Sequence, residues 1–422
     1  MSKNHASFKD WPALSEKERD RRWARVRNLM KSNGLQCMIV FGLKGREWYD
    51  HYITNDRTGG IVIIPLDGEL THLTWHPQDL VGHMQGTLRS EASWISDIRV
   101  GAVGTGVVEV LKEKGVQRGE IGVVGIKVWG TGELEGYVPY TTWSYILEEL
   151  PDIHFHEMSQ AFVRLVAVKS EEEIILVRRS AAIGELAAET MMEVTRPGTG
   201  ENEIYAAVMN QLYLNGAMGN ASPFVSPMIL HSGPDNPSWG APMWLFRGQM
   251  PRVVQKGDLV QAEIFPRYGG MEAQLQMSIA IKPVDPINQK CADLARQSFE
   301  VGLKALRPGR TLGEVVQAME KPVKEAGAWY LTPLIHSQIP LTWCGSMGVG
   351  IEHLPGFVER YKWTGNRPII GPDHVIEPNT LWELEPNVCF GRHRVNIGGI
   401  VLVTDTGVES LNTLPTEMRI VE

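Results

Sequence analysis

The second half of the sequence repeats one order of elements twice, and this repeat constrains the fold more than any other feature. Each copy has a long helical segment, an Arg-Pro-Gly turn, a second helical segment and then stretches rich in strand-forming residues. The long helices are expected within residues 171–194 and 288–309, and the shorter ones within 201–216 and 311–327. This weak duplication predicts an α+β domain in which pairs of helices cover a curved antiparallel sheet.

The first 165 residues show a different pattern, in which helices and strands alternate. Residues 16–33 are typical of an amphipathic helix, and the segment LQCMIVFG that follows is typical of a buried strand. Two strands joined at LDGE, a helix ending at Gly115 and the strand EIGVVGI continue the alternation. This order predicts an α/β domain with a parallel or mixed sheet over residues 1–165, followed by the α+β domain over residues 166–422. Ser170, just before three glutamates, is expected to cap the first helix of the second domain.

The charge and the cysteine usage of the chain exclude some classes of protein. The 422 residues carry a formal net charge of -8, whereas nucleic-acid-binding surfaces are normally basic. No apolar run approaches the roughly 20 residues that cross a membrane, and the polar N-terminus lacks the apolar core of a signal peptide. The four cysteines are far apart, which is typical of free thiols in a cytosolic protein. We therefore expect a cytoplasmic protein that binds neither nucleic acid nor a membrane.

Several segments of the second domain follow one another in an order known from one superfamily. They are KGDLVQAEIFPRYGGMEAQLQMSIAI (256–281), CGSMGVGIEHLPG (344–356), IEPNTLWELEPNVCF (376–390) and NIGGIVLVTDTGVESLN (396–412). In this order they resemble the creatinase, prolidase and aminopeptidase P superfamily, peptidase family M24. The resemblance covers roughly residues 165–422, and the N-terminal domain is similar to that of creatinase and prolidase. It implies an α/β N-terminal domain and an α+β pita-bread domain with a curved antiparallel sheet.

The resemblance also implies five metal-ligand positions, and the sequence departs from the family pattern there. Metal-dependent members hold two divalent ions with two Asp, one His and two Glu. The matching positions here are Glu263, Gln274, Met347, Glu385 and Gly398, so only two carboxylates are present. Because a dinuclear site needs several anionic ligands, we expect no metal and no other cofactor.

The likeness to creatinase, a metal-free member of the superfamily, implies roles for the remaining carboxylates. In creatinase-like enzymes, carboxylates at former metal positions hold a cationic guanidinium or amidinium group. Glu263 and Glu385 would take this role, with Gln274 and Met347 beside the substrate. Alternation in VQAEIF places Glu263 on one strand face with Gln261, although a solvated strand position is the alternative for Glu263. A carboxylate such as Glu385, inside an apolar strand, needs a partner.

Three histidines are candidates for proton transfer. The catalytic histidine that the superfamily usually places before KGD is missing from this chain. His353 resembles the substrate-contacting histidine that follows the glycine-rich segment, while His231 and His393 lie near the segments expected to form the site. Each of the three has a purely structural role as its alternative. Arg392 and Arg394, which flank His393, would bind an anion or face solvent.

Aromatic and cationic residues complete the candidate substrate site. Trp239 and Trp244 precede KGD, and their rings suit a cation or a planar group, with core packing as the alternative. Arg57 is similar to an arginine that, in creatinase, reaches the site of the partner subunit and binds the substrate carboxylate. A surface ion pair with Asp56 is the alternative for Arg57. If Arg57 has the role seen in creatinase, the protein is a homodimer whose site includes the partner N-terminal domain.

These residues together indicate a metal-independent, creatinase-like hydrolase or lyase. Its substrate would be a small polar molecule with a C–N bond, of the guanidino, amidine or cyclic amide type. Two alternatives remain: a metal-dependent Xaa-Pro aminopeptidase or prolidase, and a non-catalytic pita-bread module that binds a partner. A convergent cluster of Glu, Gln and His side chains would favour an enzyme, whereas an apolar pocket without such a cluster would favour the binding module.

Overall fold

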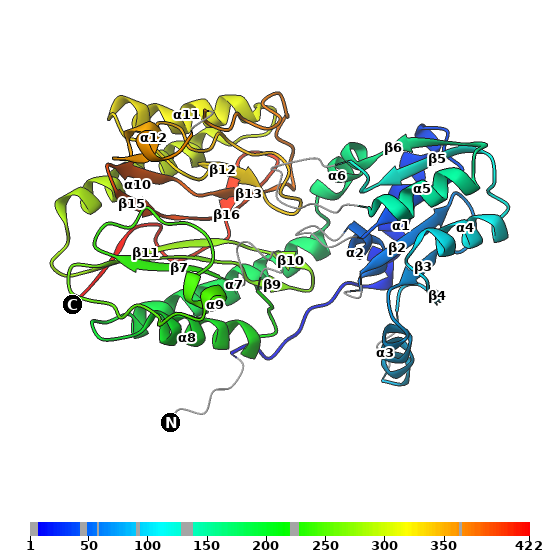
Figure 1. Ribbon diagram of the computed structural model, residues 1–422, viewed down its shortest axis with the longest axis horizontal. Coiled ribbons are helices and arrows are strands. Elements are labelled where there is room, and N and C mark those ends of the chain that lie inside the picture. Colours follow the sequence, from blue (N-terminus) through cyan, green and yellow to red (C-terminus); the bar gives the residue numbers. More distant parts are fainter. Residues whose placement is uncertain are drawn as a thin grey trace. The chain divides into compact units, whose positions relative to one another are not determined.

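The computed structural model describes residues 7–42, 49–56, 59–89, 93–127, 138–219, 228–362 and 365–422. They form two compact units, one of residues 14–167 and one of residues 168–422 joined by the N-terminal residues up to Ala13 (Figure 1). The first unit has a mixed sheet with helices, and the second has a mainly antiparallel sheet with two helix pairs. Both expected fold classes are therefore confirmed.

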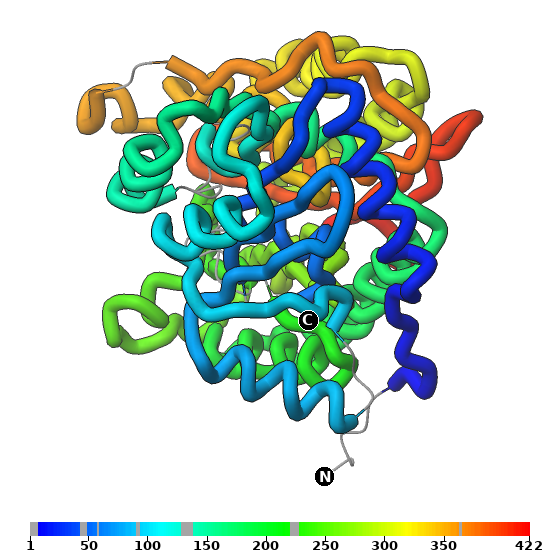
Figure 2. Tube along the Cα trace, turned by 90° about the vertical axis from the view of Figure 1, so that its right-hand side faces the viewer, coloured from blue at the N-terminus to red at the C-terminus, as the bar shows by residue number. Residues whose placement is uncertain are grey.

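The N-terminal unit contains a six-stranded sheet in the order β4-β3-β2-β1-β5-β6. The strands are β1 (Cys37–Phe41), β2 (Gly60–Pro65), β3 (Thr71–Thr74), β4 (Asp97–Val100), β5 (Gly119–Val124) and β6 (Ile153–Glu157). Strand β2 runs antiparallel to β1 and β3, and the other neighbouring pairs are parallel. The helices are α1 (Glu16–Ser32), α2 (Tyr49–Thr54), α3 (Pro77–Leu88), α4 (Gly104–Glu113), α5 (Tyr140–Glu149) and α6 (Ser159–Ala167). The coil of α1 can be followed in dark blue in Figure 2.

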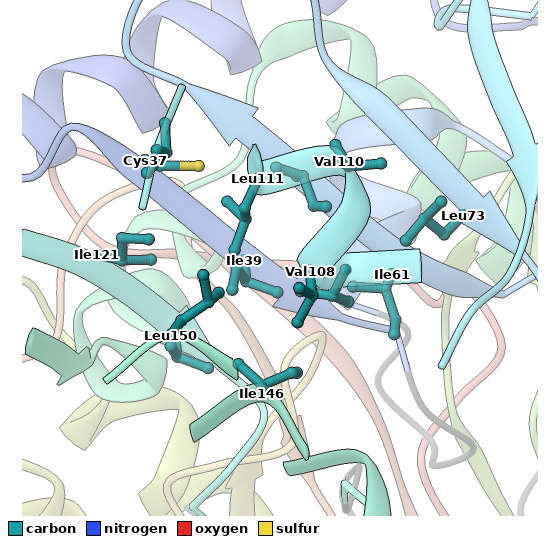
Figure 3. Close-up of a cluster of buried hydrophobic side chains, with 14 of the residues drawn as sticks. Cys37, Ile39, Ile61, Leu73, Val108, Val110, Leu111, Ile121, Ile146 and Leu150 are labelled. Carbon is teal, nitrogen blue, oxygen red and sulfur yellow. The ribbon is translucent and has the colours of Figure 1, made fainter. Parts of the chain in front are cut away.

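An apolar core holds this first sheet to its helices. Strand β1 is buried along its whole length, as a continuous apolar run predicts for a central strand. Ile39 of β1 and Ile121 of β5 belong to one cluster with Val108 of α4 and Ile146 of α5, and Figure 3 shows these side chains gathered together. Cys37 lies in the same cluster, and burial raises the pKa of its thiol to about 12. This thiol is therefore unreactive at neutral pH.

The C-terminal unit contains the two helix pairs that the sequence repeat predicts. They are α7 (Glu171–Val194) with α8 (Glu201–Leu214), and α10 (Pro286–Ala305) with α11 (Leu312–Glu325). Ser170 caps α7 as expected: its Oγ accepts from the N–H of Glu173 at 3.1 Å, and the Glu173 carboxylate accepts from the N–H of Ser170 at 2.9 Å. Shorter helical turns are α9 (Met243–Arg247), η1 (Ile351–His353) and α12 (Phe357–Arg360). None of the helices in the described part of the chain is long and apolar enough to cross a bilayer.

The large sheet of this unit has the strand order β12-β13-β16-β11-β8-β7. Its strands are β7 (Met228–Gly233), β8 (Leu259–Ile264), β11 (Leu275–Ile281), β12 (Ile335–Ser337), β13 (Leu381–Leu384), β16 (Gly398–Val403), β17 (Val408–Ser410) and β18 (Arg419–Val421). Neighbours along this order are antiparallel, β17 extends β16, and β18 runs parallel to β11. Two hairpins accompany the sheet: β9 (Arg267–Tyr268) with β10 (Met271–Glu272), and β14 (Asn387–Phe390) with β15 (His393–Asn396).

The N-terminal residues 7–13 pack against the C-terminal unit. Trp11 lies 6.3 Å from the ring of Tyr268, whose hydroxyl donates to the carbonyl of Pro12 at 3.0 Å. Arg179 of α7 pairs with Asp10 at 2.6 Å. The expected domain boundaries place residues 1–165 in one continuous domain. In the structure, aromatic and ionic contacts hold residues 7–13 to α7 and β9 of the C-terminal unit instead.

Candidate functional site

Polar side chains occupy one face of the C-terminal sheet. Side chains alternate between the two faces of a strand, so Gln261 and Glu263 of β8 share a face, as do Gln274 and Gln276 around β11. Gln276 lies opposite Glu263 on one neighbouring strand and opposite Gly398 on the other. All four polar side chains are buried. A buried sheet face is normally apolar, so this polar row indicates either a hydrogen-bonded network or a binding site.

The carboxylate of Glu385, just after β13, is bound by two side-chain amides. Gln276 Nε2 donates to Glu385 Oε2 at 2.7 Å, and Gln274 Nε2 donates to the same oxygen at 3.2 Å. Gly398 begins β16, the strand between β13 and β11. Because Gly398 has no side chain, there is room for the side chain of Gln276 to reach Glu385. Glu385 is only 3% exposed, so its charge depends on protein donors rather than on solvent.

The carboxylate of Glu263 has a cationic partner. Asn396 Nδ2 donates to Glu263 Oε1 at 2.9 Å, and Arg394 Nη2 lies 3.7 Å from the same oxygen. Both partners come from β15, two positions apart, so their side chains lie on one face of that strand. The guanidinium of Arg394 is itself buried, which strengthens its attraction to the carboxylate.

Two side-chain amides connect the two carboxylates. Asn396 Nδ2 also donates to Gln276 Oε1 at 3.2 Å, and Gln276 in turn donates to Glu385. The chain of contacts therefore runs from Arg394 through Glu263, Asn396 and Gln276 to Glu385. The amide of Gln276 has a defined orientation, because its oxygen accepts from Asn396 and its nitrogen donates to Glu385, whereas Asn396 donates twice through Nδ2.

His336 of β12 lies at the far end of this chain of contacts. Its Nε2 is 3.6 Å from Glu385 Oε1, and its Nδ1 is 2.9 Å from the carbonyl oxygen of Ser337. Because a carbonyl only accepts, Nδ1 carries a hydrogen. The Nε2 atom faces the carboxylate of Glu385, and the two groups form an ion pair when the imidazole is protonated. An imidazole oriented by a carboxylate is the arrangement that acid-base catalysis uses.

Sequence reasoning missed His336. The residue stands in LIHSQIP, a short segment that precedes the glycine-rich landmark and carries no family signature. A single histidine in an otherwise apolar strand was the available signal. Its partner became evident only through the pairing of β12 with β13, which aligns His336 with Glu383 and brings it beside Glu385.

The three histidines expected to transfer protons make their described contacts elsewhere. His231 on β7 lies opposite Gln261, but its Nε2 is 2.7 Å from the carbonyl oxygen of Gly240, and burial lowers its pKa. His393 begins β15 and points away from the Arg394 face, with Nδ1 3.0 Å from Asn288 Oδ1 of α10. His353 in η1 is exposed.

The expected substrate-binding residues are dispersed. Trp244 Nε1 donates to Glu201 Oε2 at 3.1 Å, at the start of α8, and Trp239 is 40% exposed. Met347 is partly buried and lines a pocket of about 500 Å³ together with Leu331, Gly348, Ile351, Gly365, Asn366 and Arg367. Among the expected substrate-binding residues that the structure describes, Gln274 is the one with a hydrogen bond to a site carboxylate, that of Glu385. Arg57 lies outside the residues that the structure describes.

The donor set at the five family metal positions does not fit a dinuclear metal site. Amide and guanidinium hydrogens point at the oxygens of Glu263 and Glu385 that an ion would need. Gly398 has no donor, and a Cβ there would lie 2.1 Å from the carbonyl oxygen of Leu384, so this backbone has no room for a ligand side chain. Nowhere in the described ranges do three or more His, Cys, Asp or Glu side chains gather as a metal would require.

A profile of metallopeptidase family M24 matches residues 176–405. The probable dipeptidase PepE of Mycobacterium tuberculosis is 27% identical over 260 residues, which cover 61% of this chain and 62% of that protein. Creatinase of a Bacillus species is 19% identical over 418 residues, which cover 96% of this chain and 92% of that protein.

Solved structures share the fold along nearly the whole chain. The Xaa-Pro dipeptidase from Bacillus anthracis has a TM-score of 0.71 at 18% identity, covering 96% of this chain and 100% of that one. An X-Pro aminopeptidase from Thermotoga maritima also has a TM-score of 0.71, at 17% identity, covering 94% of this chain and 99% of that one. The likeness confirms the two-domain pita-bread architecture.

Proposed function

The chain belongs to metallopeptidase family M24, within the creatinase, prolidase and aminopeptidase P superfamily, and we propose that it is a metal-independent hydrolase or lyase of that family. Its substrate is a small polar molecule with a C–N bond, of the guanidino, amidine or cyclic amide type. One observation carries the proposal: Glu263 and Glu385 remain at two family metal positions, but side-chain amides and a guanidinium bind them. The alignment with a creatinase over 96% of the chain supports it.

The geometry suggests how the chemistry is divided among the residues. A water molecule adds to the carbon of the C–N bond and loses a proton to the pair formed by Glu385 and His336. The same pair returns a proton to the nitrogen as the C–N bond breaks, so the proton count of the pair is unchanged at the end. Gln274 and Gln276 hold Glu385 in one orientation throughout.

The convergence of Glu, Gln, Asn and His side chains also supports an enzyme over a binding module. Such buried polar groups destabilise a fold unless they are fully paired, and they are therefore most often retained for chemistry. Glu263, Glu385 and His336 are each 3% exposed. A module that only binds a partner has no need for carboxylates that are withdrawn from solvent in this way.

Two measurements test the proposal. Elemental mass spectrometry of the purified full chain, dialysed without chelator, is expected to find far less than one equivalent of Mn, Fe, Co or Zn. A panel of guanidino, amidine and cyclic amide compounds is then screened for release of amine or ammonia. Glu385→Gln is expected to lower turnover about 100-fold or more, whereas the control Glu359→Gln, on the exposed face of α12, leaves it unchanged. Stoichiometric metal, or full activity of Glu385→Gln, would sink the proposal.

A second candidate is a metal-dependent peptidase that acts on Xaa-Pro dipeptides. The 27% identity to a probable dipeptidase favours it, although that match spans only 62% of the length of the dipeptidase. Hydrolysis of an Xaa-Pro dipeptide that a chelator abolishes and Mn²⁺ or Co²⁺ restores would establish it. The donor set described above argues against this candidate, because only two of the five positions have carboxylates.

A further inference from the structure

The guanidinium of Arg394 has a permanent positive charge and lies beside one of the two site carboxylates, that of Glu263. Arg394 is 2% exposed. Its Nη1 donates to the carbonyl of Ser238 at 3.1 Å, and its Nη2 donates to Thr332 Oγ1 at 3.4 Å and lies 3.7 Å from Glu263 Oε1. These contacts fix the plane of the guanidinium beside the carboxylate. The pair is therefore built into the fold, rather than being a flexible surface contact.

Three buried polar atoms, on Arg394 and on two residues beside it, have no hydrogen-bond partner among the described residues. They are Arg394 Nε, Asn396 Oδ1 and Gln261 Oε1. The three residues are neighbours: Gln261 Nε2 donates to the carbonyl of Arg394, and Asn396 follows Arg394 by two positions on β15. Buried polar atoms are paired in more than about nine cases in ten. Three unpaired atoms on neighbouring residues therefore mark a place where a bound molecule would supply the missing partners.

The unpaired atoms specify the chemistry of that molecule. Arg394 Nε is a donor, and the oxygens of Asn396 and Gln261 are acceptors. Their complement has one acceptor oxygen and two N–H donors, as in a carboxamide or a ureide. A guanidinium or amidinium group offers donors alone and leaves Arg394 Nε without a partner.

Charge balance leads to the same conclusion. The carboxylate of Glu263 is already compensated by Arg394, and Glu385 has His336 3.6 Å away. A cationic substrate group placed beside Glu263 would also be placed beside the buried guanidinium, and like charges in a low-dielectric site repel strongly. An uncharged polar group avoids this cost.

We propose that Arg394 is the internal cation of this site and that the group bound beside it is an uncharged amide, such as a carboxamide, ureide or cyclic amide. The amide oxygen accepts from Arg394 Nε, and its N–H groups donate to the side-chain oxygens of Gln261 and Asn396. This inference rests on the proposed function and narrows its substrate class by removing the guanidino and amidine types.

A pair of probes that differ only in this group tests the inference. N-carbamoylglycine and guanidinoacetate share one skeleton and one carboxylate, but the first has a neutral ureide and the second a guanidinium. Isothermal titration calorimetry with the purified full chain at neutral pH is expected to show N-carbamoylglycine binding at least about tenfold tighter.

Two substitutions are expected to reverse this preference. Gln261→Glu keeps the side-chain shape and replaces an acceptor amide with a carboxylate, so guanidinoacetate becomes the tighter ligand. Arg394→Met removes the internal cation and has the same effect. Arg392→Met is the matched control, because Arg392 is an exposed neighbour that pairs with Asp235 at 2.6 Å. This control is expected to retain the wild-type ratio. If Arg394→Met fails to fold, Gln261→Glu tests the inference alone.

The outcomes separate this inference from the proposed function. Equal binding, tighter binding of guanidinoacetate, or a Kd above about 10 mM for both probes overturns the inference. If neither the wild type nor Gln261→Glu binds either probe, water alone satisfies the three atoms, and the inference is overturned. A protein that prefers guanidinoacetate but holds no stoichiometric metal contradicts only the inference, whereas stoichiometric metal contradicts the proposed function itself.

Discussion

At the residue scale, the imidazole of His336 carries more of the proposed chemistry than any histidine chosen from the sequence. His231, His353 and His393 were chosen for their nearness to family landmarks, but nearness along the chain says little about which strand lies beside which. His336 contacts Glu385 because β12 pairs with β13. The position of His336 beside Glu385 therefore follows from strand pairing.

Replacing His336 tests its role. His336→Asn keeps a polar group of similar size that still hydrogen-bonds, but it removes the titratable ring. We expect the kcat for the substrate identified in the panel to fall about 100-fold or more, with a smaller change in KM, because proton transfer is lost while binding contacts remain. Steady-state kinetics measures this split. The exposed His353→Asn is the control, and equal kinetics for both variants would remove His336 from the mechanism.

A second residue-scale prediction concerns Asp50 of α2 in the N-terminal unit. This carboxyl is fully buried, accepts from the N–H of Gly60 at 2.9 Å and lies 4.0 Å from His72 Nε2. Burial raises the pKa of Asp50 to about 7 and lowers the pKa of His72 to about 4. Because the folded pKa of Asp50 lies above its unfolded value, its contribution to stability is complete below the unfolded pKa and is lost as pH rises through about 7.

Asp50 by itself is therefore expected to lower the stability of the wild type between about pH 5 and about pH 7, by an amount on the order of 3 kcal/mol. His72 works in the opposite sense, because a pKa lowered from 6.5 to about 4 costs stability as pH falls below about 6.5, and this offsets much of the Asp50 effect there. Asp50→Asn keeps an acceptor for Gly60 and removes the Asp50 contribution, so the stability of this variant should rise relative to that of the wild type as pH increases across this range. Urea unfolding of both proteins across this range measures the effect, and parallel curves would rule out Asp50 as its source.

At the element scale, the two helix pairs and the sheet alternation follow directly from local sequence rules. Ser170 and Glu173 form a capping box at the start of α7, and Thr311 with Glu314 does the same for α11. The alternation around Glu263 was also visible in the sequence. What local rules did not give is the position of β15, whose Arg394 and Asn396 complete the environment of Glu263.

Gly398 provides a prediction about strand packing. A Cβ at this position would lie 2.1 Å from the carbonyl oxygen of Leu384 and 2.8 Å from Glu385 Cα, so β16 approaches β13 too closely for any side chain. We expect Gly398→Ala to destabilise the unit by about 2 kcal/mol or more. Gly407→Ala is the matched control, because its nearest neighbour would be 3.8 Å away. Chemical denaturation compares the two, and similar midpoints would contradict the close approach.

At the scale of the whole molecule, the homodimer stays a prediction that rests on Arg57. If Arg57 reaches the site of the partner subunit, then Arg57→Ala and Glu385→Gln damage different halves of one composite site. Equal amounts of the two inactive variants, unfolded and refolded together, are expected to recover about a quarter of wild-type activity, since half of the dimers carry one intact site. Light scattering establishes the dimer. No recovery from mixed dimers would place Arg57 in its own subunit or outside the site.

The sequence by itself determined the fold class and the family, and it predicted the departure from the family's metal-ligand pattern. These are consequences of local patterning and of landmarks whose order along the chain is enough to recognise. Only the tertiary structure decided how the carboxylates are compensated. Arg394, Asn396 and His336 lie 131, 133 and 73 positions from Glu263 in the chain, and antiparallel pairing brings them to one buried face. There, the energy of a buried charge depends on its nearest partners, which no local pattern specifies.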